Sequence, residues 1–140
     1  MIPYKRHTLS NGLTVAVNRD RQSKLAAVNI LYKVGARNED PARTGFAHLF
    51  EHLMFRGTRR IPNFDLPVQM ACGDNNAFTN NDYTDFYITL PKDNIETALW
   101  LEADRMTGLD ISPEALETEK RVVIEEYKPV SYTHLTLPTT

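Results

Sequence analysis

Residues 45–55 read Gly-Phe-Ala-His-Leu-Phe-Glu-His-Leu-Met-Phe. The apolar side chains of this stretch cover nearly the whole circumference of a helix, and a helix that is apolar all round is expected to be buried. We expect the helix to begin after an N-cap at Thr44 and to end before Gly57, because these residue types favour those positions. The stretch therefore predicts a helix in the interior of the domain.

This helix carries three polar side chains, those of His48, Glu51 and His52. The two histidines are four residues apart, so they lie about 40° apart around the axis and about 6 Å apart along it. Both imidazoles can reach one metal ion, and a Zn²⁺–N bond of about 2.1 Å is feasible from each. The carboxylate of Glu51 is close enough to hold a metal-bound water. The alternative is that both histidines are core residues bonded to the backbone, with Glu51 paired to one of them.

A catalytic zinc site usually has three protein ligands and one open position, so a third ligand is needed from elsewhere in the chain. A second helix is expected from Ser112-Pro113-Glu114, a strong start signal, to about residue 128. Its candidate ligands are Glu117, Glu119, Glu125 and Glu126. Glu119 and Glu126 are seven residues apart and share a face of the helix. The spacing leaves Glu125 and Glu126 open as the third ligand, and most glutamates on helices are simply solvated.

The rest of the chain predicts an α+β fold, a mostly antiparallel sheet with helices packed on one face. Asn11-Gly12 is typical of a hairpin turn, with one strand ending near Leu9 and the next covering residues 13–17. Period-two alternation of apolar residues predicts a half-buried strand near residues 86–90. The other expected elements are a strand at 26–34, a short helix at 64–71, a turn at 80–82, and a helix to Met106 that begins with a capping box of Asp93 and Glu96.

The composition of the chain argues against several classes of protein. The chain has 140 residues, enough for one domain with a real core, and its net charge of −2 argues against binding to nucleic acid. No apolar run approaches the roughly 20 residues of a membrane span. The first residues lack the apolar stretch of a secretory signal, and the single cysteine, Cys72, excludes an internal disulfide. We therefore expect a soluble, cytoplasmic protein.

In these residues the chain resembles the pitrilysin-like M16 metallopeptidases, or inverzincins, whose zinc motif is His-x-x-Glu-His. The resemblance extends from about Tyr4 to Lys128. It includes, in family order, residues 11–13, 34–39, 45–55, 76–79 and 119–126. It implies a fold of the LuxS/MPP-like metallohydrolase type and the activity of a zinc-dependent endopeptidase that acts on peptides or unfolded segments.

The resemblance also implies a set of ligands. One zinc ion per chain would be held by His48, His52 and Glu126, and Glu51 would be the general base. The seven-residue spacing of the glutamates makes Glu119 the acidic residue that orients a ligand or an imidazole.

Asn76 and Ala77 match a segment of the family in which the backbone of a peptide substrate pairs as an added strand. An exposed sheet edge suits that role, because it offers unpaired N–H and C=O groups. Without the resemblance, a simple turn at Asn75-Asn76 is an equally good interpretation.

The resemblance has limits that bear on domains and partners. The family's active form is longer, and a later domain supplies Arg and Tyr groups toward the substrate carbonyl. We therefore interpret residues 1–128 as a truncated amino-terminal catalytic domain whose partners are downstream domains or a partner subunit. Pro129 is expected to end the last helix. Residues 129–140, His134 included, are unlike the family and are interpreted as an artefactual tail without function.

Two other functions compete with that of an endopeptidase. A non-catalytic, structural or substrate-presenting subunit of the same family would typically have lost motif residues, whereas all of them are present here. A metal-binding module without hydrolysis would need no base beside its ligands, and Glu51 is hard to explain in such a module.

Overall fold

The computed structural model describes residues 2–133 and the side chains of residues 2–128. The chain forms an α+β fold with antiparallel strands, as predicted, but the strands form two sheets and not one. One sheet is a hairpin of β1 (Lys5–Thr8) and β2 (Thr14–Val17). The other has the strand order β3-β5-β4, so β4 lies at an edge. Its strands are β3 (Leu25–Tyr32), β4 (Asp74–Thr79) and β5 (Thr84–Pro91).

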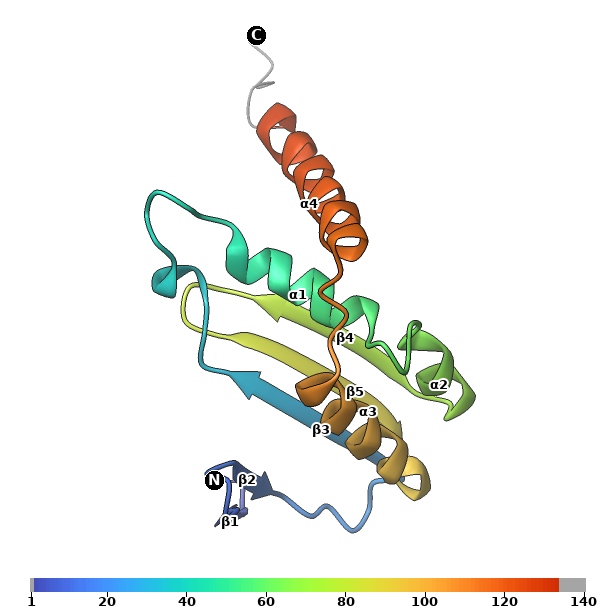
Figure 1. The fold of residues 1–140 in the computed structure, drawn as a ribbon. Helices are drawn as coiled ribbons and strands as arrows, with labels where there is room; N and C mark the ends of the chain where they lie inside the picture. The colour runs from blue at the N-terminus through green and yellow to red at the C-terminus, as the bar shows by residue number, and fades with distance from the viewer. Residues whose placement is uncertain (1, 134–140) are drawn as a thin grey trace, which may run out of the picture.

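The helices are α1 (Phe46–Arg56), α2 (Asp65–Met70), α3 (Ile95–Thr107) and α4 (Pro113–Thr133), with short 3-10 turns η1 (Ala36–Asn38) and η2 (Lys92–Asn94). Figure 1 shows α1 and α3 over one face of the three-stranded sheet, and α4 rising from α1 away from it. This arrangement agrees with the predicted packing of helices on one face. Within the described residues, no helix combines the length and apolarity that crossing a bilayer requires.

The core lies between this sheet and the helices α2 and α3. Phe86, Ile88 and Leu90 alternate along β5 as predicted, and each is at most 1% exposed. Ile88 and Leu90 share a cluster with Val28 of β3, with Phe64 and Val68 at α2, and with Ala98 and Leu101 of α3. Full burial of one such side chain contributes about 1.5–3 kcal/mol, so this cluster holds the sheet and α3 together.

A buried ion pair links α3 to α1. Arg105 and Glu102 lie on α3, with Nε of Arg105 3.0 Å from Glu102 Oε2, and both side chains are almost fully buried. The guanidinium stacks over the rings of Phe64 and Phe86 and donates a hydrogen bond to the backbone carbonyl of Met54 on α1. Burial raises the pKa of Glu102 and lowers the pKa of Arg105, because it penalises the charged form of each.

Two predicted helix starts are wrong. Gly45, with a φ of +94°, is the N-cap of α1 in place of Thr44, and it has no side chain to satisfy the free N–H groups of the first turn. The carboxylate of Glu39 accepts hydrogen bonds from the N–H groups of Gly45 and Ala47 instead. A capping group six residues earlier, in a loop, gives no local pattern in the sequence.

The predicted capping box at Asp93 is also absent, because residues 92–94 form η2 and α3 begins after Asn94. The start of α4 was predicted correctly, since Ser112 Oγ accepts a hydrogen bond from the N–H of Ala115.

Two further expectations about the helices are wrong. Of the α1 side chains, Ala47 and Leu53 are buried, but Phe46 and Phe50 are 49% and 43% exposed, because the sheet and α4 cover only part of the helix. The last helix continues through Pro129 to Thr133. A proline removes its own N–H from the helical ladder and crowds the preceding turn, but Pro129 lies within the last five residues of α4, close to its end. Residues 134–140, His134 included, lie outside the described residues.

Candidate metal centre

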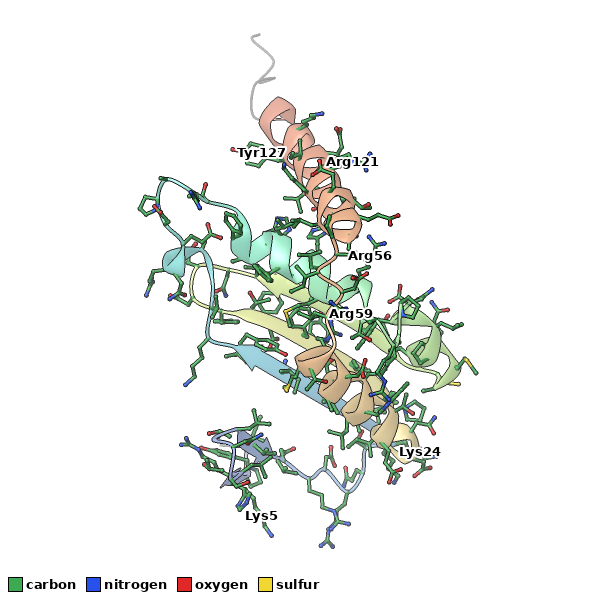
Figure 2. All side chains as sticks on the ribbon, in the orientation of Figure 1. Lys5, Lys24, Arg56, Arg59, Arg121 and Tyr127 are labelled. Carbon is green, nitrogen blue, oxygen red and sulfur yellow. The ribbon has the colours of Figure 1, made fainter. Side chains whose placement is uncertain are left out.

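The candidate site forms where α4 passes α1. His48 and His52 lie one turn apart on α1, and Glu119 and Glu126 lie two turns apart on α4. Figure 2 labels Arg56, from the last turn of α1, near the start of α4. The helical spacing within each element and the crossing of the two elements therefore bring residues 48–56 and 119–126 together.

Three ligand atoms converge at this crossing. Nε2 of His48 and Nε2 of His52 are 3.2 Å apart. Glu126 Oε2 lies 3.4 Å from Nε2 of His52 and 3.8 Å from Nε2 of His48. A tetrahedral zinc ion with bonds of about 2.1 Å separates its ligand atoms by about 3.4 Å. The three observed distances bracket that value, so the donor set fits a zinc ion.

The side chains of the three candidate ligands differ in their exposure to solvent. The side chain of His52 is 18% exposed, whereas those of His48 and Glu126 are 45% and 52% exposed. The site is thus closed on the side of His52 and open on the side of His48 and Glu126. Such an opening is what a catalytic metal site needs for a fourth, exchangeable position.

Glu119 lies behind the ligands and is largely buried. Its Oε2 is 3.6 Å from Nδ1 of His52, which is within ion-pair range but too long for a hydrogen bond, and its Oε1 is 3.4 Å from Nη1 of Arg56. A carboxylate beside the second nitrogen of a metal-binding imidazole fixes the tautomer and orientation of the ring. Glu119 is placed for that task, and Arg56 holds its other oxygen.

Glu51 lies beside the candidate ligands, and one of its oxygens has no partner among the described residues. This oxygen, Oε2, is buried. The side chain lines a cavity of about 370 Å³ together with His48, His52, Phe55, Arg56, Asn76, Ala77, Glu119 and Glu126. Leaving a buried acceptor unpaired costs roughly 1–3 kcal/mol or more, and a water held in this cavity can relieve that cost by donating to Glu51.

The edge strand borders the same cavity. Asn76 and Ala77 lie in β4, so the interpretation of this segment as a turn is wrong. β4 is an edge strand of its sheet, and the N–H of Ala77 donates to the side-chain oxygen of Asn76 at 2.8 Å. An unpaired strand edge thus runs beside the candidate metal site.

A second cavity, of about 520 Å³, lies on the other side of α1 and is mainly apolar. Phe46 and Phe50 contribute to its wall, which explains why these side chains are exposed. Glu51 borders both cavities.

Sequence reasoning missed two residues that act around the site. Arg56 follows the histidine motif on α1 and contacts Glu119. A basic residue in the last turn of a helix is so common that its presence carries no signal. Glu39 caps α1 from a loop, and no spacing rule connects it to the helix.

Comparison with known sequences gives a consistent set of relatives. The sequence model of the family described as insulinase (peptidase family M16) matches residues 14–138. That match runs past residue 128, and the boundary expected there stays a prediction. A zinc protease, PqqE, of Helicobacter pylori is 37% identical over 122 residues, which cover 85% of this chain and 28% of that protein. A probable mitochondrial-processing peptidase subunit beta of Schizosaccharomyces pombe is 33% identical over 125 residues, covering 88% of this chain and 27% of the relative.

Two solved structures also superpose closely on this chain. The crystal structure of a protease from Helicobacter pylori superposes with a TM-score of 0.85 at 34% identity, covering 90% of this chain and 31% of that chain. The crystal structure of pitrilysin gives a TM-score of 0.80 at 25% identity, covering 91% of this chain and 14% of the other. This chain therefore spans less than a third of the length of each of these relatives.

Proposed function

Because the chain belongs to the insulinase family of peptidases, peptidase family M16, we propose that it carries the zinc-binding half of an endopeptidase active site. The substrates would be peptides or unfolded segments. The observation that supports this proposal is the convergence of His48, His52 and Glu126 beside the unpaired carboxylate of Glu51. Relatives named zinc proteases give independent support for the choice of metal.

One zinc ion per chain would be held by His48 Nε2, His52 Nε2 and Glu126 Oε2, whose separations suit tetrahedral coordination. Glu119 would orient His52 through its Nδ1. When bound, zinc lowers the pKa of a water toward about 7 and polarises the scissile carbonyl.

Glu51 would be the general base. Its carboxylate takes a proton from the attacking water as the water oxygen bonds to the carbonyl carbon. The same proton then passes to the leaving amine as the C–N bond breaks, which returns Glu51 to its charged form. Burial beside the ligands and the absence of another partner in the described residues leave its Oε2 available for this exchange.

The edge of β4 would hold the peptide backbone. A strand added at an open edge gains main-chain hydrogen bonds with little demand on side-chain sequence. The carbonyl of a bound peptide would replace the side chain of Asn76 as the acceptor for the N–H of Ala77. Binding there places the peptide along the wall of the cavity that contains the ligands.

The complete active site would include groups from outside this chain. The chain spans 28% of the zinc protease from Helicobacter pylori and 31% of the solved protease from that organism. We propose that downstream domains or a partner subunit supply the groups that face the substrate carbonyl from the opposite side.

Replacing the base tests the proposal. With the downstream domains or the partner subunit present, the zinc-loaded protein is expected to cleave an unstructured peptide. Glu51→Gln is expected to retain one zinc per chain while cleavage falls by about 10²-fold or more. Mass spectrometry of the peptide products and metal analysis of the same samples measure both properties. Undiminished turnover by Glu51→Gln would show that Glu51 is not the general base. Full zinc binding without cleavage by the parent, with those domains or the partner subunit present, would favour a non-catalytic subunit.

A further inference from the structure

We propose that Glu39 is a positioning residue for the metal site and acts on zinc affinity through His48. The inference rests on the proposed zinc site. It concerns a residue of the loop before α1, which contacts neither the ligand atoms nor the cavity that contains them.

The first turn of α1 depends on Glu39. The first N–H groups of a helix have no partner within the helix, and Gly45 at the N-cap has no side chain to offer one. Glu39 Oε2 accepts from the N–H of Gly45 and Glu39 Oε1 accepts from the N–H of Ala47, each at 2.7 Å. Both bonds are short and charge-assisted, and a negative charge at this end also suits the helix dipole.

His48 belongs to this first turn. It follows Ala47 directly, whereas His52 lies one turn further into the helix. Loss of the cap frays the first turn before the second, so the ring of His48 would lose its fixed position while the ring of His52 kept it. The exposure of His48 means that packing does little to hold this ring in place.

The loop that presents Glu39 is fixed to the sheet. The N–H groups of Ala36 and Arg37 donate to the carbonyls of Asn80 and Asn81, in the turn between β4 and β5. Arg37 also pairs with Asp82 at 2.9 Å. Gly35 permits this approach, since a Cβ there would lie 2.4 Å from the carbonyl oxygen of Asn80. Glu39 therefore connects the metal-binding helix to the turn that follows the edge strand β4.

Zinc affinity of the 140-residue chain, measured by competition with a chromophoric chelator, tests the proposal. Glu39→Ala is expected to weaken zinc binding by about 10–100-fold, as is typical when a group that orients a ligand is lost. Glu39→Gln retains one acceptor oxygen and is expected to fall between Glu39→Ala and the parent. If Glu39→Ala does not fold, Glu39→Gln is the variant that tests the proposal.

Two controls separate positioning from general destabilisation. Asn63 Oδ1 accepts hydrogen bonds from the N–H groups of Asp65 and Leu66 at the start of α2, so Asn63→Ala removes a helix cap away from the metal site. It is expected to change zinc affinity by less than about 2-fold. In a His48→Ala background, Glu39→Ala is expected to add less than about 2-fold, because the residue on which it acts is gone.

The outcomes of these measurements distinguish the positioning role of Glu39 from the proposed zinc site. The positioning role would be overturned if Glu39→Ala weakened zinc affinity no more than Asn63→Ala does. It would also be overturned if Glu39→Ala weakened zinc affinity equally with and without His48. Neither result would contradict the zinc site itself. A folded parent chain that binds no zinc would overturn the proposed function and the role of Glu39 with it.

Discussion

Arg105 is the buried charge on which the contact between α3 and α1 depends. It pairs with Glu102, stacks on two aromatic rings and donates to the carbonyl of Met54. Arg105→Ala would leave the carboxylate of Glu102 buried without its partner, and breaking a buried pair costs roughly 3–5 kcal/mol. We expect a loss of that size in the free energy of unfolding, measured by urea denaturation of the metal-free chain.

An exposed ion pair gives the matched control. Lys120 lies 3.9 Å from Glu117 on α4, and both side chains are more than half exposed. Lys120→Ala is expected to change the free energy of unfolding by less than about 1 kcal/mol, because solvent screens such pairs. Equal effects of the two substitutions would show that Arg105 does not hold α1 on α3.

Site residues that are close together in the sequence could be predicted, whereas those that depend on tertiary contacts could not. His48, Glu51 and His52 lie within five consecutive residues, so helical geometry alone predicted that the two imidazoles reach one point. The choice between Glu125 and Glu126 needed the family resemblance, because it depends on how α4 is rotated against α1. The structure turns Glu126 toward the histidines, while Glu125 pairs with Lys128. Glu39 was not predictable, since its contact with α1 depends on the path of a loop.

At the scale of elements, α1 is terminated by a glycine that no other residue replaces easily. Gly57 has a φ of +142°, and a Cβ there would lie 2.3 Å from the carbonyl oxygen of Ile61. Gly57→Ala therefore combines backbone strain with a clash against backbone atoms. We expect a loss of about 2 kcal/mol or more in the free energy of unfolding, measured by chemical denaturation.

The glycine that ends α3 serves as the comparison. Gly108 has a negative φ, and a Cβ added there would have the carbonyl oxygen of Asp104 as its nearest neighbour, at 3.2 Å. Gly108→Ala is expected to cost less than about 1 kcal/mol. A Gly57→Ala chain as stable as Gly108→Ala would contradict the account of how α1 ends.

Element types were predictable where a period was long and clear, and element ends were not. The alternation of apolar residues in β5 and the start signal at Ser112 both gave correct predictions. The start of α1 was missed because its cap is distant in sequence, and the start of α3 was missed because a 3-10 turn precedes it. These ends depend on tertiary contacts, which local propensity does not contain.

At the scale of the whole molecule, α4 depends on α1 for its attachment beside the sheet. It rises away from the sheet, and its far part shows Tyr127 projecting into solvent (Figures 1 and 2). The candidate ligands lie on both helices, so a bound metal would connect α4 to the domain. The antiparallel sheet with helices on one face was predictable from composition and pattern. The exposure of Phe46 and Phe50 was not, because it depends on which surfaces pack against α1.

Zinc content per chain tests the central claim most directly. The folded parent chain is expected to bind one zinc ion, Glu126→Gln clearly less, and Glu125→Gln as much as the parent, because Glu125 faces Lys128 and not the histidines. Metal analysis after dialysis, with circular dichroism to establish folding, measures this. Absence of zinc from a folded parent, or equal zinc content in the parent and Glu126→Gln, would contradict the three-ligand site.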